Sequence, residues 1–97
     1  QLQLPPNVSR ILYVRGLPKK MSSEELYALF GKHGAIRQIR MGLAENKKTF
    51  GTAYIVYEDI LDAKRAVDHL EGFVVEKRYL SVSYYQPHRR KRARDVK

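Results

Sequence analysis

The chain has 97 residues, with 19 Lys and Arg against 10 Asp and Glu, which gives a formal net charge of +9. This length allows one small domain and excludes a large enzyme, and the absence of cysteine excludes disulfides, a thiolate nucleophile and cysteine-ligated zinc. The charge favours nucleic acid over a membrane as the partner, because no apolar run of about 18 residues and no signal-peptide core is present.

The start of the chain predicts a leader followed by a strand. Residues 1–9 contain Pro5 and Pro6 without hydrophobic periodicity, which is typical of an extended leader. Residues 11–14 form a β-branched and aromatic run closed by Gly16, Leu17 and Pro18, which predicts a strand ended by a turn. Because the chain begins with Gln1 and not with Met, we expect it to be part of a longer protein.

A first helix is predicted from its cap and its apolar stripe. Ser22 fits the N-cap, and Glu25 three residues later completes a capping box. The apolar stripe consists of Leu26, Leu29 and Phe30. The helix is expected to end at Gly31 and Gly34.

The remaining elements alternate in the same way. Strands are predicted over Ile36–Met41, 50–57 and 79–85, with a flexible loop over 42–49 and a short hairpin arm over 73–75. A second helix is predicted with a buried face formed by Ala63, Ala66, Val67 and Leu70. Gly72 is expected just after its end.

The resulting βαββαβ order predicts an α+β, ferredoxin-like fold. Such a fold is a four-stranded antiparallel sheet with both helices on one face and the other face open. We place this domain at residues 10–86. Residues 88–97 alone carry a net charge of +5, so we expect 87–97 to be a basic tail that buries no face by itself.

Alternation along the strands decides which side chains stand on the open face. The residues expected to point outward are Tyr13, Arg15, Thr52, Tyr54 and Val56, and those expected in the core are Leu12, Val14, Ala53, Ile55 and Tyr57. The first and third strands are the central pair of this topology, so Tyr13 and Tyr54 should lie close together. Two exposed rings flanked by cations suit single-stranded RNA, whose unpaired bases stack on aromatic side chains. The flanking cations are Arg15, Arg37, Arg40, Lys47 and Lys48.

Two segments resemble the motifs of a known family. Residues 12–17, Leu-Tyr-Val-Arg-Gly-Leu, resemble the hexamer of the RNA recognition motif (RRM), and residues 50–57, Phe-Gly-Thr-Ala-Tyr-Ile-Val-Tyr, resemble its octamer. The resemblance implies stacking roles for Tyr13 and Tyr54. Three positions depart from the family pattern: Gly16 replaces the usual Asn, Phe50 a Lys or Arg, and Thr52 an exposed aromatic residue.

Further stretches, over residues 7–15, 30–40 and 51–59, narrow the resemblance to the small RRM subunits of splicing factor 3b. These subunits belong to the spliceosomal particle that recognises the intron branch site. The resemblance implies a nuclear protein whose sheet is covered by the large scaffold subunit of splicing factor 3b. It also implies that Tyr13 lies near the branch-point adenosine.

These arguments assign two sets of residues. RNA contacts are expected from Tyr13, Arg15, Tyr54, Arg40, Lys47 and Lys48, and contacts to the partner protein from Ile11, Phe50, Thr52, Val56 and Tyr85. We expect no catalytic residue, no cofactor and no metal, because His33, His69 and His88 lack ligand spacing.

Three alternatives stay open. The chain can be a free-standing single-stranded RNA-binding RRM protein instead of a scaffold-held subunit, or, more remotely, an acyl-phosphate hydrolase on the same fold. Tyr13 can instead fill space beneath a loop or a terminal helix. The basic run from Arg89 can be an import signal, a phosphate contact or a solvated end.

Overall fold

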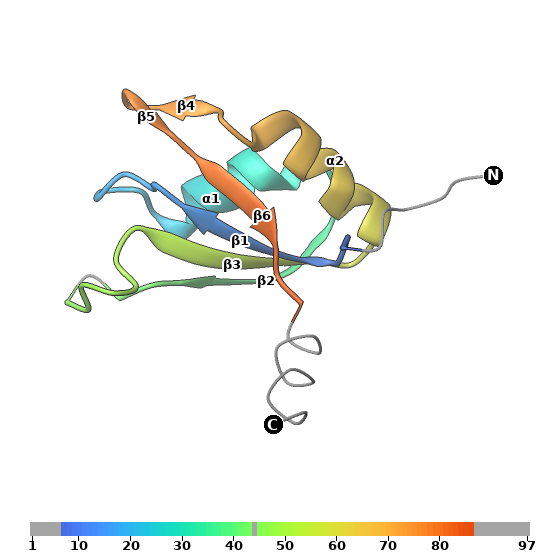
Figure 1. Ribbon diagram of the computed structural model, residues 1–97, viewed down its shortest axis with the longest axis horizontal. Helices are drawn as coiled ribbons and strands as arrows, with labels where there is room; N and C mark the ends of the chain where they lie inside the picture. Colours follow the sequence, from blue (N-terminus) through green and yellow to red (C-terminus); the bar gives the residue numbers. More distant parts are fainter. Residues whose placement is uncertain (1–6, 44, 87–97) are drawn as a thin grey trace.

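The computed structural model describes residues 7–43 and 45–86 (Figure 1). Its elements are β1 (Ile11–Arg15), α1 (Ser23–Gly31), β2 (Ile36–Met41), β3 (Thr52–Tyr57), α2 (Ile60–Leu70), β4 (Val74–Val75), β5 (Arg78–Tyr79) and β6 (Ser81–Tyr84). An antiparallel sheet has the strand order β2-β3-β1-β6, and β4 and β5 form a separate hairpin. Both helices cover one face of the sheet, so the predicted α+β, ferredoxin-like fold is confirmed. The predicted leader lies mostly outside the described residues, and the predicted tail lies wholly outside them.

The helices begin where the sequence signals predict. The Ser22 side chain accepts a hydrogen bond from the Glu25 amide at 3.2 Å, and the Glu25 carboxylate accepts one from the Ser22 amide at 2.8 Å. This reciprocal capping box satisfies two amides that the first turn leaves unpaired. Helix α2 is capped by Asp59, whose carboxylate accepts from the Leu61 amide at 2.8 Å.

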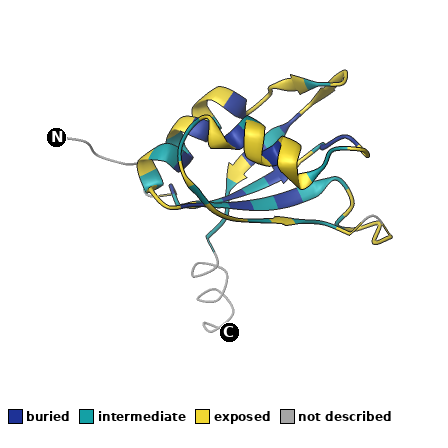
Figure 2. Ribbon diagram, turned by 180° about the vertical axis from the view of Figure 1, so that it is seen from behind, coloured by how far each residue is buried: buried dark blue, intermediate teal, exposed yellow. Residues whose placement is uncertain are grey.

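The core lies between the helices and the sheet, where the buried segments gather (Figure 2). It consists of Leu12, Val14, Leu17, Leu26, Phe30, Ala53, Ile55, Tyr57, Ala63, Ala66, Leu70, Leu80 and Val82. The five residues that alternation assigned to the core in the first and third strands are all among them. Within the described chain, no helix is long and apolar enough to cross a membrane.

The predicted boundaries of the third and the last strand are wrong. The third strand starts at Thr52 and not at Phe50, because residues 50 and 51 belong to a turn in which Gly51 has a φ of +78°. The last strand of the sheet spans Ser81–Tyr84 and not 79–85, because Tyr79 pairs with Val74 in the β4–β5 hairpin. That hairpin corresponds to the predicted arm after α2.

The segment before β1 is attached to the end of β6. Val8 is buried, and its carbonyl accepts a hydrogen bond from the Gln86 side chain at 3.2 Å. The Ser9 hydroxyl donates to the Tyr85 carbonyl at 2.7 Å. These contacts hold the two ends of the domain together beside the sheet.

One buried hydroxyl links the sheet to the end of α1. Tyr57 is fully buried, and its hydroxyl donates to the Phe30 carbonyl at 2.6 Å. Burial, with the negative charge of Asp62 nearby, raises the pKa of Tyr57, so its hydroxyl stays a donor across the physiological range.

We predict that Tyr57→Phe lowers the free energy of unfolding by about 0.5–1.5 kcal/mol. The cost is moderate because the Phe30 carbonyl still accepts from the amides of Lys32 and His33. Urea denaturation measures the change. Tyr79→Phe is the matched control, since Tyr79 is 74% exposed and should tolerate the loss of its hydroxyl. Equal effects of the two variants would contradict the prediction.

A histidine pair that the sequence analysis did not foresee joins α2 to the turn after α1. The rings of His33 and His69 stack with centroids 5.1 Å apart and planes 20° apart. A ring nitrogen of His69, Nδ1, lies 2.8 Å from the Arg65 carbonyl. Partial burial, together with the positive charges of His69, Arg65 and Lys32, lowers the pKa of His33.

We therefore predict a loss of stability in mild acid. A histidine whose pKa is lower in the folded state binds its proton more readily when unfolded, so stability declines as the pH falls below about 6.5. The decline ends below the folded pKa. Thermal unfolding of the wild type and of His33→Gln between pH 8 and pH 5 measures this effect. The variant should show a smaller decline, and an identical decline would contradict the prediction.

Candidate nucleic-acid interface

Strand register builds one row of side chains across the middle of the face opposite the helices, hereafter the helix-free face. Tyr13 of β1 lies opposite Tyr54 of β3, and Tyr54 lies opposite Arg40 of β2. On the other side, Tyr13 lies opposite Ser83 of β6. Residues that pair in register point to the same side of a sheet, so the expected neighbours Tyr13, Tyr54 and Arg40 come together.

Three tyrosines form a ring cluster on this face. The rings of Tyr13 and Tyr54 are 5.1 Å apart and tilted by 37°, and those of Tyr54 and Tyr85 are 5.0 Å apart in an edge arrangement. Tyr13 and Tyr54 are each partly exposed. Ring-to-ring contacts therefore hold the three tyrosines together on this face.

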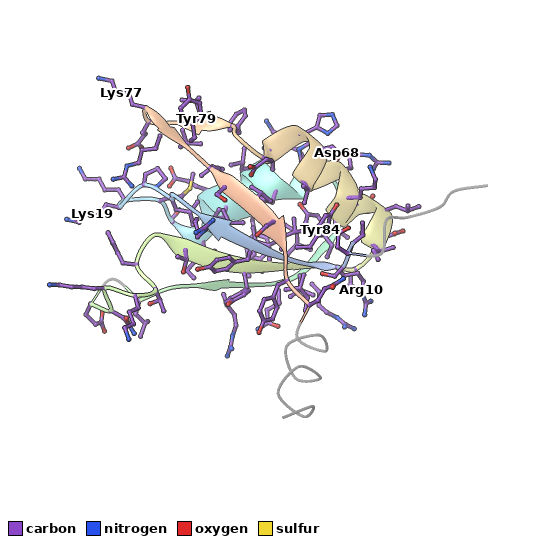
Figure 3. All side chains as sticks on the ribbon, in the orientation of Figure 1. Arg10, Lys19, Asp68, Lys77, Tyr79 and Tyr84 are labelled. Atoms are coloured by element: carbon purple, nitrogen blue, oxygen red, sulfur yellow. The ribbon has the colours of Figure 1, made fainter. Side chains whose placement is uncertain are left out.

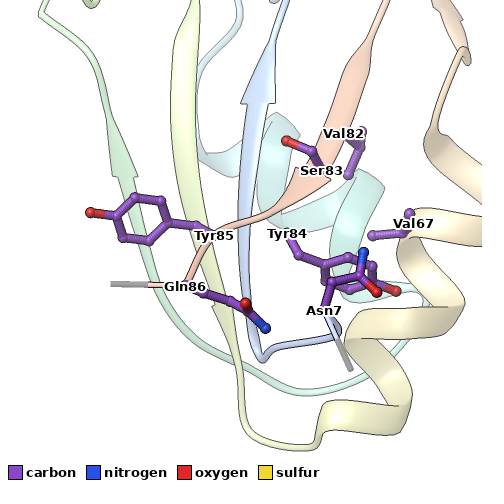
Figure 4. A pocket seen from close by; sticks show the side chains of 7 residues that line it. All are labelled: Asn7, Val67, Val82, Ser83, Tyr84, Tyr85 and Gln86. Atoms are coloured by element: carbon purple, nitrogen blue, oxygen red, sulfur yellow. The ribbon is translucent and has the colours of Figure 1, made fainter. Parts of the chain in front are cut away.

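At the end of β6, the side chains of two adjacent tyrosines point in different directions. Figure 4 shows Tyr84 directed toward α2, near Val67, while Tyr85 points across the sheet toward β3. These two tyrosines, with Asn7, Val67, Val82, Ser83 and Gln86, line a cavity of about 530 Å³ beside β6. Tyr84 packs against the core, whereas the Tyr85 ring joins the cluster on the helix-free face.

The cations expected around the rings divide into two groups. The Arg15 guanidinium lies 5.9 Å from the centre of the Tyr13 ring and donates to the Ser81 hydroxyl at 3.3 Å. Arg37, in contrast, occupies a bulge of β2 and forms a salt bridge of 3.7 Å with Glu58. Arg15 and Arg40 thus belong to the candidate interface. Arg37 is engaged with Glu58, and the expectation that it also flanks the rings stays a prediction.

The loop between β2 and β3 turns around Asn46. The Asn46 carbonyl accepts from the amides of Thr49 and Phe50, and its side chain accepts from the Lys48 amide at 2.9 Å. Lys47 and Lys48 are exposed on this turn, and neither joins a salt bridge within the described part of the chain. Between the loop and Tyr54 lies a cavity of about 470 Å³, lined by Arg40, Met41, Gly42, Leu43, Asn46, Thr49, Thr52 and Tyr54.

The expected partner-binding residues occupy two different places. Val56 and Ile11 face each other in register at one end of the helix-free face, and the Tyr85 amide donates to the Ile11 carbonyl at 2.8 Å. Thr52 lies at the other end of β3, opposite Arg15, and its hydroxyl donates to the Thr49 carbonyl at 2.6 Å. The RRM pattern has an exposed aromatic ring at the position of Thr52. In this chain the side chain at that position instead forms a hydrogen bond within the loop that precedes β3.

Phe50 precedes the strand, as noted above, and is not one of the rings of the tyrosine cluster. It is 37% exposed and lines a small cavity with Pro18, Lys19, Glu76 and Arg78. The sequence analysis overlooked Lys19, although the Pro18-Lys19-Lys20 segment after the first strand is a visible basic signal. Among the described residues, no three His, Asp or Glu side chains gather as a metal site.

The comparisons with known proteins agree with this geometry. The sequence profile of the RNA recognition motif matches residues 12–81. The chain belongs to the RRM family. It is 64% identical over 84 residues to a splicing factor 3B subunit 6-like protein of Arabidopsis thaliana, covering 87% of this chain and 66% of that protein. It is 61% identical over 85 residues to splicing factor 3B subunit 6 of Drosophila melanogaster, covering 88% of this chain and 69% of that protein.

A solved complex of the Sxl-lethal protein with RNA has a similar RRM fold. The TM-score is 0.72 and the identity 35%, with 80% of this chain and 47% of that chain covered. The resemblance to the small RRM subunits of splicing factor 3b, drawn from the motifs, is therefore confirmed. The chain spans just under two thirds of the Arabidopsis relative.

One departure from the RRM pattern has a local cause. Gly16 follows β1 with a φ of +84°, and a Cβ atom there would lie 2.7 Å from the Tyr79 carbonyl oxygen. Glycine adopts this backbone conformation without strain and has no Cβ. The fifth position of the hexamer in this RRM is therefore Gly because the β4–β5 hairpin approaches it closely.

Proposed function

We propose that this RRM is a subunit of the pre-mRNA splicing machinery that contacts single-stranded RNA through Tyr13 at or near the branch-point adenosine. The large scaffold subunit of splicing factor 3b would bind the same helix-free face. On this proposal the protein acts in the nucleus as a binding module, without catalysis, cofactor or metal.

The observation that carries the proposal is the Tyr13–Tyr54 pair at the centre of the sheet. Partly exposed rings offer planes on which bases stack, and each stacked base contributes about 1–3 kcal/mol. Arg15 beside Tyr13 supplies a cation for a phosphate or a base edge. The identity to splicing factor 3B subunit 6 connects this general RNA-binding chemistry with splicing.

The scaffold part of the proposal is supported by the apolar end of the same face. Ile11 and Val56 form a cross-strand pair there, with Tyr85 next to them. Apolar and aromatic side chains in one patch favour a protein partner, because their burial stabilises a complex by roughly 25 cal/mol per Å². The alternative, a free-standing RNA binder, requires no partner at this end.

We predict that Tyr13→Ala weakens binding of single-stranded branch-site RNA by about 1–3 kcal/mol, because the stacking ring is lost. Tyr13→Phe should cost far less, since it keeps the ring and loses only the hydroxyl. The affinities are measured by titration of labelled RNA, and ultraviolet crosslinking in the assembled particle identifies the contacted residue. Thermal unfolding checks that both variants fold.

A crosslink that stays in the Lys47–Lys48 loop and survives Tyr13→Ala would contradict the base contact. Micromolar RNA binding by the free chain, unaffected by the scaffold subunit, would favour the free-standing alternative. Weak binding alone that becomes strong in the complex would favour the scaffold-held subunit.

We predict that Val56→Glu abolishes capture of the scaffold subunit from nuclear extract, because it places an unpaired charge in the apolar patch. Leu61→Glu is the matched control, since Leu61 is 37% exposed on α2, on the helix-covered side. Capture is measured by mass spectrometry of bound proteins. Capture that survives Val56→Glu but is lost in Leu61→Glu would place the docking surface on the helices.

A further inference from the structure

A second aromatic and basic site lies at the end of the sheet, outside the ring cluster. Residues from three separate segments meet there around a cavity of about 280 Å³: Pro18, Lys19, Phe50, Glu76 and Arg78. The side chains of Lys19, Lys77 and Tyr79 lie toward this end of the molecule, and Arg10 lies at the opposite end (Figure 3). The volume is at the lower limit of the roughly 300–1,000 Å³ of small-molecule pockets, which suits a single base.

The site combines the two chemistries that single-stranded nucleic acid requires. Phe50 keeps 37% of its surface exposed, and the Lys19 ammonium lies 5.8 Å from the centre of its ring. A ring beside an ammonium can stack a base while the cation meets the adjacent phosphate. Arg78 is a second exposed cation at the same cavity, and a guanidinium can bind phosphate through two hydrogen bonds.

Glu76 gives the site a preference among bases. It is the acidic member of the cavity lining and lies in the β4–β5 turn, with a φ of +48°. A carboxylate accepts hydrogen bonds from an amino group on a base edge, such as N4 of cytosine, and uracil has no such group. A stacked base with an exocyclic amine therefore fits better than uracil.

The backbone connects this site to the ring cluster. Arg15 follows Tyr13 by two positions on β1 and lies on the same face, in register with Thr52. Phe50 precedes Thr52 by two residues, and the Leu17 amide donates to the Gly51 carbonyl at 3.0 Å. This bond ties the two segments that carry Lys19 and Phe50 together at the end of the same face. A strand of RNA stacked on Tyr13 can thus continue past Arg15 to Phe50.

We propose that the Phe50 cavity is an additional nucleotide-binding subsite: the base stacks on Phe50, Glu76 accepts from its amino group, and Lys19 and Arg78 bind the phosphate. The proposal rests on the proposed RNA-binding function and extends its footprint beyond the sheet. It replaces the expectation that Phe50 serves the protein partner, since two cations beside one ring favour a polyanion over an apolar peptide.

The test uses fluorescence anisotropy with labelled cytidine oligonucleotides of three and nine residues, rC3 and rC9. The short oligonucleotide covers the ring cluster only, and the long one also reaches the subsite. We expect Phe50→Ala to weaken rC9 binding by roughly 5- to 150-fold and to leave rC3 binding unchanged. Lys19→Ala should weaken rC9 binding and reduce its salt dependence, and Phe50→Tyr should keep most of the affinity.

Two matched controls separate the site from general effects. Phe73→Ala removes a ring of similar exposure, 43% against 37% for Phe50, that lines a different groove beside α1, and Lys32→Ala removes an exposed cation from that same groove. Both should bind rC9 as the wild type does. The wild type should also bind rC9 more tightly than the uridine nonamer rU9, and Glu76→Gln should reduce this difference.

The possible outcomes distinguish failure of the subsite proposal from failure of the proposed function. Unchanged rC9 binding by Phe50→Ala, with both oligonucleotides sensitive to Tyr13→Ala, would overturn the subsite alone. The same RNA result together with lost capture of the scaffold subunit would assign Phe50 to a protein contact and also overturn it. Sensitivity of rC9 to Phe50→Ala but of neither oligonucleotide to Tyr13→Ala would support the subsite and contradict the proposed role of Tyr13. No binding of either oligonucleotide by the wild type at low salt would overturn both.

Discussion

The antiparallel pairing of β1 with β3 at the centre of the sheet determines both the core and the candidate interface. One register places Leu12 opposite Ile55 on the helix side and Tyr13 opposite Tyr54 on the other side. A slip by one residue would exchange these faces and bury two tyrosines in place of aliphatic side chains. Because Leu12 and Ile55 are completely buried, the core itself holds the two rings at the distance at which they touch.

Much of the fold follows from local signals in the sequence. The capping box of Ser22 and Glu25 and the alternation around Tyr13 depend only on nearby residues, so they predict the helix start and the two faces correctly. Features that depend on which residues pair or pack together were missed. Tyr79 leaves the last strand because it pairs with Val74, and the His33 ring meets His69 only after the helices pack.

The residues of the candidate site likewise divide into those that the sequence could place and those that it could not. Tyr13, Tyr54 and Arg40 could be predicted together because strand pairing places them in one row. Phe50 could not be placed, because the turn at Gly51, and not the strand period, determines its direction. Its neighbour Lys19 follows a different strand, and no periodic pattern relates a turn residue to a loop residue.

The helix-free face changes character along the direction of β1, and on the proposed function this polarity would let two partners share the face. Ile11 and Arg15 mark the two ends of β1, about 13 Å apart at 3.3 Å per residue. The Ile11 end carries Val56 and Tyr85 and suits an apolar protein segment. The Arg15 end is followed by the cavity that carries Lys19 and Arg78, and such cations favour phosphate groups. Tyr13 lies between them, so a protein seated on the apolar end would form one wall of a pocket around its ring and leave the basic end accessible to RNA. On the proposed function, a partly dehydrated pocket of this kind would strengthen the electrostatic contacts near the Tyr13 ring, and a face with few aromatic platforms would then hold a single base.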